Sequence, residues 1–254
     1  MRNYLIRWIR RRAAINPIEL CKQIDARLKT TLSDQHLELY LRSVRYSKAQ
    51  ARQDLIALLL NKFQRGGNYI EIGATDGVAL SNTHLLSRNF GWTGILVEPN
   101  LHYFKELKKN RKTDKLFNCA ISNSSGIEVD FFETKYPELS TLRIDYDDAW
   151  LNERNIGLKK TKVKTLTLAD LINNSGQESP INFLSIDVEG AELEVLSSLN
   201  DTKVPILYIC VEHSNNESRR NAIAAIMSAN GYSKLEFGFD YWDDWYELSS
   251  TQTS

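Results

Sequence analysis

The stretch that decides the fold is NYIEIGATDG, which runs from Asn68 to Gly77. Its apolar residues predict a short buried strand, and the glycines at positions 73 and 77 predict a tight turn directly after it. In a doubly wound sheet the first strand delivers such a turn to the ligand crevice, where glycines let the backbone approach the ligand closely. The carboxylate of Glu71, inside this strand, is therefore a candidate for ligand binding.

Working outward from this stretch, short apolar segments alternate with segments of helical periodicity. We expect strands at 68–73, 94–99, 115–122, 181–190 and 204–213, and helices at 79–90, 101–112, 191–199 and 217–231. This alternation predicts an α/β protein with βαβ units and a mostly parallel, doubly wound sheet. Residues 232–248 are rich in aromatic residues and predict a closing antiparallel hairpin, with Asp243 and Asp244 in its turn.

Residues 1–65 differ from the rest of the chain. They contain 14 Lys and Arg against 5 Asp and Glu, whereas the whole chain has no net charge. Residues 37–63 place apolar side chains at helical intervals without Gly or Pro, which predicts a helix ending before Gly66. We therefore expect two parts: a basic helical extension over 1–65 and a catalytic or binding domain over 66–254.

The first segment, residues 1–14, has the pattern of a basic amphipathic helix, which favours peripheral contact with an anionic membrane surface at its inner face. A solvated helix, or one packed on protein, is the alternative. The segment lacks the apolar core of a signal peptide, and no apolar run is long enough to span a bilayer. Three scattered cysteines without a CxxC pair indicate a reducing, cytoplasmic location. No zinc, helix–turn–helix or RNA-binding motif points to a nucleic acid partner.

Further acidic residues stand at the ends of other predicted strands. Glu98 follows Gly77 by 21 residues, which matches the spacing of a carboxylate that binds a ribose. The turn lacks the middle glycine of a dinucleotide fingerprint, and the charges of Glu71 and Asp76 disfavour a pyrophosphate. They suit a ligand with an amine and a sulfonium cation, such as S-adenosylmethionine. Asp187 and Glu189 end one buried strand, and Glu212 and His213 end the next.

With these motifs in order, the chain resembles the FkbM-type family of S-adenosylmethionine-dependent methyltransferases. The family implies a Rossmann-like class I methyltransferase fold, and its members typically O-methylate sugars, glycans or natural-product hydroxyls. Its first turn often has Asn where this chain has Thr75, which keeps a hydrogen-bonding side chain. The matching stretches are YIEIGATDGVALSNTHLL, GWTGILVEPNLHYFKEL, FNCAISNSSG and FLSIDVEGAELEVL.

The resemblance also implies a set of cofactor-binding residues. Near the methionine end it places Glu71, Gly73, Ala74, Thr75, Asp76, Gly77, Ser81 and Asn82. Around the ribose and adenine it places Glu98, Pro99, Asn100, Asn118, Cys119 and Ala120. Asp187 is expected beside the transferable methyl group.

Methyl transfer to a hydroxyl needs a base that accepts the proton of the attacking group. The candidates are Asp187, Glu189, Glu212 and His213, and the sequence does not choose among them. Asp187 is best placed by its position at a strand end, and His213 has an ordinary pKa in the useful range. A divalent ion held by Asp187, Glu212 and His213 is an alternative that we do not favour. Glu189 has a further alternative as a first-turn helix residue.

The sequence thus predicts an S-adenosylmethionine-dependent O-methyltransferase that acts on a hydroxyl, on a sugar of a glycan or of a glycosylated metabolite. Two rivals are a non-catalytic Rossmann-like binding module and a NAD-dependent oxidoreductase. The acceptor is expected to contact the variable stretch 134–160 and the C-terminal hairpin. No sequence feature indicates an oligomeric state.

Overall fold

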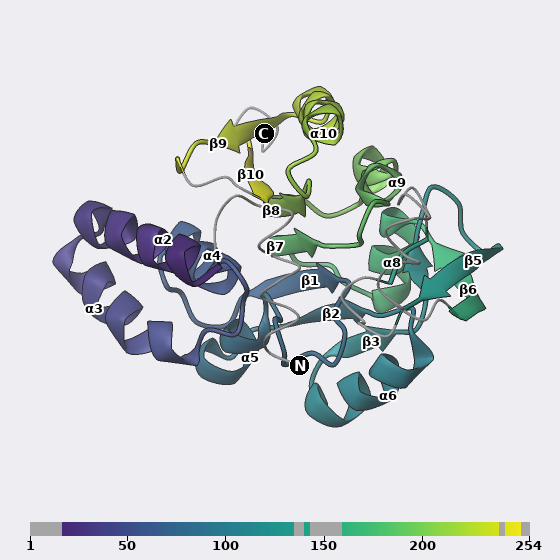
Figure 1. The fold of residues 1–254 in the computed structure, drawn as a ribbon, viewed down its shortest axis with the longest axis horizontal. Helices are drawn as coiled ribbons and strands as arrows, with labels where there is room; N and C mark the ends of the chain where they lie inside the picture. Colours follow the sequence, from purple (N-terminus) through teal and green to yellow (C-terminus); the bar gives the residue numbers. More distant parts are fainter. Residues whose placement is uncertain (1–16, 135–139, 143–158, 239–241, 250–254) are drawn as a thin grey trace.

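The fold was analysed in a computed structural model of the chain, which describes residues 17–134, 140–142, 159–238 and 242–249. A twisted sheet runs through the middle of the molecule, with helices on both sides (Figure 1). The segment 1–14 and most of the stretch 134–160 lie outside the described residues. Among the described residues, no helix is long and apolar enough to cross a membrane.

The main sheet has seven strands in the order β3-β2-β1-β7-β8-β10-β9. Its parallel part contains β1 (Asn68–Ile72), β2 (Thr93–Val97), β3 (Lys115–Phe117), β7 (Ile181–Ile186) and β8 (Ile206–Glu212). The last two strands form the expected antiparallel hairpin, but β10 (Asp243–Leu248) inserts between β8 and β9 (Tyr232–Leu235). The central strands are buried on both faces, which explains their nearly continuous apolar sequences.

Two apolar clusters cover opposite faces of this sheet, because neighbouring side chains of a strand point to opposite sides. Tyr69 and Phe183 belong to the first cluster, and Ile70 and Leu184 belong to the second. The first face carries α5 (His84–Phe90) and α6 (Leu101–Asn110). The second carries α8 (Leu168–Ser175), α9 (Glu192–Leu196), the 3₁₀ turn η3 (Leu199–Asp201) and α10 (Glu217–Ala229). The sheet is therefore doubly wound, as predicted.

The described part of the N-terminal extension is helical, as expected, and packs on the first face. Its elements are α2 (Pro17–Thr31), α3 (Asp34–Ser43), the 3₁₀ turn η1 (Val44–Tyr46) and α4 (Gln53–Leu60). Leu20, Ile24 and Leu55 are buried in the same cluster as Tyr69 and Phe183. The boundary near residue 65 is therefore a change of secondary structure within one continuous core.

Three local expectations were wrong. The helix predicted over 37–63 is interrupted between η1 and α4, where Arg52 has a φ of 63°. Asp243 and Asp244 do not form the hairpin turn, because both lie in β10 and pair with β8. The strand predicted over 115–122 is divided into β3 and β4 (Ala120–Ile121), which belong to different sheets.

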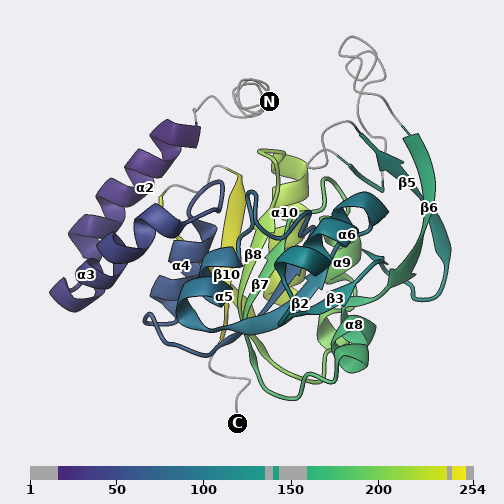
Figure 2. The same cartoon turned by 90° about the horizontal axis from the view of Figure 1, so that it is seen from below.

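The second sheet is small and has the order β4-β6-β5. Its longer strands, β5 (Glu128–Glu133) and β6 (Lys159–Leu166), are antiparallel and stand at the edge of the molecule (Figure 2). Lys160 and Lys162 both contact Asp130 on the neighbouring strand, at 2.6 Å. Phe131 points the other way and is buried, so that β5 contributes to the wall of the pocket described below.

Candidate active site

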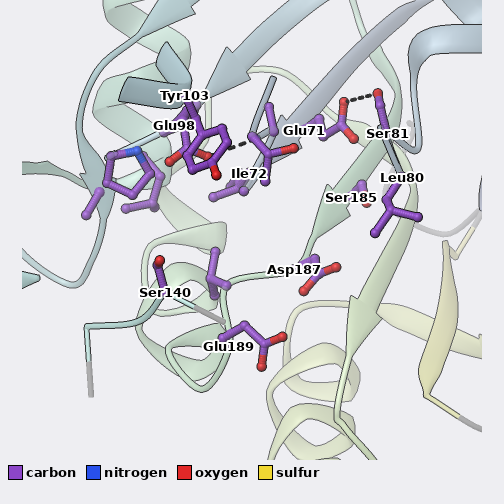
Figure 3. A pocket seen from close by; sticks show the side chains of 18 of the residues that line it. Glu71, Ile72, Leu80, Ser81, Glu98, Tyr103, Ser140, Ser185, Asp187 and Glu189 are labelled. Atoms are coloured by element: carbon purple, nitrogen blue, oxygen red, sulfur yellow. Dashed lines mark hydrogen bonds between the residues drawn. The ribbon is translucent and has the colours of Figure 1, made fainter. Parts of the chain in front are cut away.

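A cavity of about 160 Å³ lies at the carboxyl ends of β1, β2, β7 and β8, where open α/β sheets bind ligands. Figure 3 shows Glu98 and Tyr103 together at one side of it, and Asp187 and Glu189 at another. Most residues predicted to bind the cofactor or to act as the base line this cavity. They are Glu71, Gly73, Ala74, Thr75, Asp76, Ser81, Asn82, Glu98, Pro99, Cys119, Ala120, Asp187, Glu189 and Glu212.

Glu98 ends β2 and is held in a fixed orientation by the backbone. Its Oε2 accepts a hydrogen bond from the amide of Thr75 at 2.8 Å, and its Oε1 accepts one from the amide of Asn100 at 2.7 Å. Burial raises the pKa of Glu98 to about 7, although these two amides oppose the shift. Each carboxylate oxygen keeps a second lone pair, so Glu98 can accept two further hydrogen bonds from a diol.

The turn after β1 brings the backbones of two strands into contact. Gly73 has a φ of 92°, and a Cβ at this position would lie 1.9 Å from the carbonyl oxygen of Asp187. Only glycine fits such an approach. The amide of Asp187 in turn donates to the carbonyl of Ile72 at 3.1 Å. The glycine turn and the acidic end of β7 therefore form one rigid side of the cavity.

Glu71 holds the segment that follows this turn. Its carboxylate accepts hydrogen bonds from the amide of Asn82 at 2.6 Å and from the hydroxyls of Ser81 at 2.9 Å and Thr83 at 2.6 Å. Burial raises the pKa of Glu71, and the nearby guanidinium of Arg111 lowers it. The carboxylate inside the strand thus shapes residues 81–83 of the cavity wall, and its own oxygens are largely occupied.

Three carboxylates meet at the end of β7 and β8. One oxygen each from Asp187, Glu189 and Glu212 lies within 4.8 Å of the other two. Asp187 lines the cavity with an accessible side chain, and desolvation by the surrounding protein atoms raises its pKa to about 7. A hydrogen bond with Glu212 opposes this shift, whereas the charges of Glu189 and Asp243 add to it. Near neutral pH the Asp187 carboxyl therefore exchanges a proton readily.

His213 lies outside the cavity lining and is buried. Its Nδ1 accepts a hydrogen bond from the amide of Asn215 at 3.2 Å, and its Nε2 lies 3.7 Å from Asp244. Burial is the main reason that its pKa falls to about 4, so the ring is neutral near pH 7. This geometry connects His213 to β10 rather than to the three carboxylates.

Three other predicted residues do not line the cavity but stabilise the segments that do. Asn100 caps α6 through its side chain, which accepts hydrogen bonds from the amides of His102 and Tyr103. The side chain of Asn118 donates to the carbonyls of Glu98 and Pro99, at 2.8 and 3.0 Å. Gly77 has a φ of 73°, and a Cβ there would collide with Leu107 and Arg111.

A family model described as the methyltransferase FkbM domain matches residues 71–239, which is more than half of the chain. The chain belongs to this family. The match begins at Glu71, in the strand quoted at the outset, and includes every acidic residue that lines the cavity. The family assigns the sheet to the Rossmann-like class I methyltransferases and argues against an oxidoreductase.

Solved structures also resemble this FkbM-domain protein at low sequence identity. The FkbM methyltransferase of Methylobacillus flagellatus is 12% identical with a TM-score of 0.45, and the match covers 91% of this chain and 58% of that one. An O-methyltransferase of Bacillus cereus in complex with SAH is 14% identical with a TM-score of 0.43, and the match covers 88% of this chain and 95% of that one. This chain thus spans little more than half of the Methylobacillus protein. A comparison with curated proteins gave no match.

Several residues that line the cavity were not predicted from the sequence. Gln50 comes from the extension, and Phe131 and Leu142 come from the region of the second sheet, so no motif connects them to the site. Tyr103 offered a usable signal, because it is an aromatic residue in the first turn of the helix that follows Glu98. The other lining residues that were not predicted are Ile72, Ala79, Leu80, Val97, Ile121, Ser140, Ser185 and Val188.

Proposed function

We propose that this FkbM-domain protein is an S-adenosylmethionine-dependent O-methyltransferase that acts on a hydroxyl group of a sugar, in a glycan or in a glycosylated metabolite. The observation that carries the proposal is the acidic lining of the cavity, in which some carboxyl groups are charged and others have a raised pKa. Six carboxylates line it, and no Lys, Arg or His does so among the described residues. Such a wall attracts a cationic ligand and repels a pyrophosphate.

The residues present fit this cofactor. Glu98 has free lone pairs for the ribose hydroxyls, and apolar side chains beside it, Cys119, Ile121 and Phe131, suit an adenine ring. When bound, S-adenosylmethionine supplies a methyl group on a sulfonium centre. Asp76 and Asp187 line the same cavity and can supply negative charge toward that cation.

Asp187 is the residue that we assign as the general base. It is accessible from the cavity, whereas Glu189 and Glu212 are more than nine-tenths buried. Its pKa of about 7 lies near the operating pH, where a general base is most effective. The hydrogen bond between Asp187 and Glu212 gives the accepted proton a second carboxylate to share.

Titration with S-adenosylhomocysteine tests the cofactor assignment. We expect wild-type protein to bind it, and the Glu98→Ala variant to bind it about a hundredfold more weakly, because two hydrogen bonds to a charged group are lost. Glu128→Ala, at an exposed position of β5, is the matched control and should bind like wild type. Binding of NAD in place of S-adenosylhomocysteine would contradict the proposal.

The nature of the acceptor is tested by the product. Methyl-labelled S-adenosylmethionine should transfer its label to a sugar fraction as an ether, which resists mild alkali. Release of labelled methanol by alkali would instead reveal a methyl ester and a carboxylate acceptor.

The three carboxylates also offer a site for a divalent ion, since their oxygens lie within 4.8 Å of one another. We do not favour an ion, because displacement of a methyl group from a sulfonium centre needs a base but no Lewis acid, and Asp187 is available as that base. Turnover should therefore be the same after dialysis against EDTA and after addition of Mg²⁺. Loss of turnover in EDTA, with recovery in Mg²⁺ or Mn²⁺, would instead assign Asp187, Glu189 and Glu212 as ligands.

A further inference from the structure

The N-terminal extension reaches the cofactor cavity, although the family match begins only at residue 71. Gln50 lies between η1 and α4, where the predicted helix is interrupted, and it lines the cavity. The neighbouring Ala49 forms a parallel bridge with Leu80, which is also a lining residue. This bridge places Gln50 beside the segment that leads from the glycine turn to Ser81 and Asn82.

The turn that carries Gln50 is held rigidly. The buried carboxylate of Asp54 accepts hydrogen bonds from the hydroxyl of Ser47 at 2.7 Å and from the amide of Lys48 at 3.1 Å. The side chain of Gln53 accepts from the amide of Ala51 at 2.8 Å and donates to Asp243 on β10 at 2.7 Å. Contacts on both sides of residue 50 therefore fix its backbone relative to the main sheet.

The amino-acid end of S-adenosylmethionine carries an ammonium group and a carboxylate. The carboxylate is the group that this acidic cavity binds less favourably. Six carboxylates repel it, and no cation lines the described wall. A neutral hydrogen-bond donor is therefore required. The hydroxyl of Ser81 is not available, because it donates to Glu71.

Two carboxamide side chains line the cavity, and they differ in which hydrogen-bonding group has no partner among the described residues. Asn82 is more than nine-tenths buried; its Nδ2 donates to Ser185 at 2.9 Å, and its Oδ1 accepts no hydrogen bond within the described structure. Gln50 is half-buried, and its side-chain amide makes no hydrogen bond to any described residue. One carboxamide thus presents an open acceptor, and the other presents an open donor.

We propose that Gln50 is a cofactor-binding residue whose Nε2 donates to the carboxylate of S-adenosylmethionine, while Oδ1 of Asn82 accepts from its ammonium group. The inference rests on the proposed function, since it names two contacts of the same cofactor. It also gives the extension a role in binding, because part of the site lies outside the family domain.

The test compares two ligands by calorimetric titration. S-adenosylhomocysteine has the amino and carboxyl groups, whereas 5′-methylthioadenosine has the same nucleoside and thioether without them. Gln50→Ala should weaken the binding of S-adenosylhomocysteine about ten- to a hundredfold, as expected for the loss of one hydrogen bond to a charged group. The affinity for methylthioadenosine should be unchanged. Gln50→Glu should weaken the binding of S-adenosylhomocysteine further, because it adds a seventh carboxylate to the cavity lining.

Gln64→Ala is the matched control, since this exposed glutamine of the extension lies outside the cavity lining. Unchanged binding of S-adenosylhomocysteine by both Gln50 variants would overturn the inference and leave the proposed function standing. An equal loss for both ligands would also overturn it, because the effect would then arise from the nucleoside side. Wild-type protein that binds neither ligand would overturn the proposed function together with the inference.

Discussion

Replacement of Asp187 by asparagine is expected to lower methyl transfer by about a hundred- to ten-thousandfold, the usual contribution of a general base. Binding of S-adenosylhomocysteine should remain close to wild type, because the amide has the size of the carboxyl and the glycine turn contacts only the backbone of residue 187. The measurement is single-turnover transfer of labelled methyl groups, with binding followed by titration.

The pH profile gives a second readout of the same residue. Because the pKa of Asp187 is raised to about 7, the carboxylate forms as the pH increases through that value. Wild-type turnover should therefore rise between about pH 6 and pH 8, and the asparagine variant should lack this rise. The effect on stability has the opposite sign. Because the folded state raises the pKa of this carboxyl, stability falls as the pH rises from the ordinary carboxyl pKa toward 7. The neutral asparagine variant lacks this loss and should fold well at pH 8.

Matched variants separate Asp187 from its neighbours. Asp201→Asn, at an exposed position of η3, should behave as wild type. His213→Gln should retain most turnover, because His213 faces Asp244 rather than the cavity. Wild-type rates in Asp187→Asn would refute its assignment as the base, and a bound cofactor without transfer in any preparation would favour the non-catalytic binding module.

Replacement of Arg111 by methionine is expected to destabilise the fold by about 3–5 kcal/mol, the range found when one partner of a buried ion pair is removed. Arg111 is 1% exposed on its side chain and bonds Asp114 at 2.9 Å. Its remaining donors contact the carbonyl of Gly77 at 2.9 Å and the hydroxyls of Tyr69 at 2.7 Å, Thr83 at 3.0 Å and Ser81 at 3.3 Å. The variant leaves all of these groups buried without their donor.

Thermal unfolding measures this effect, and the midpoint should fall by roughly 10 °C. Arg111→Lys keeps the charge but cannot reach all five groups, so its midpoint should lie between those of wild type and Arg111→Met. Lys109→Met, at an exposed position two residues earlier, is the control and should unfold like wild type. An unchanged midpoint in Arg111→Met would show that the network contributes no net stability.

The strand ends that carry the site were predictable from the sequence because they depend on local patterns. Glu98 and Asp187 each follow a short apolar run, and parallel strands bring their carboxyl ends to one edge. The glycine turn is local as well, since its conformation requires the residue type at position 73. The FkbM resemblance and the doubly wound fold followed from the order of these segments.

What only the tertiary structure decided depends on contacts between distant residues. Arg111 lies in the run KKNRK, which by itself has the character of a solvated surface, and it is buried because Tyr69, Gly77 and Thr83 surround it. The break at Gln50 is hidden in a helical pattern. The carboxylate of Asp54 accepts a hydrogen bond from Ser47 in the turn there, and Ala49 forms a bridge with Leu80, a residue distant in the sequence. Local periodicity carries no information about either partner, so the extension's place at the cofactor cavity appears only when the chain is folded.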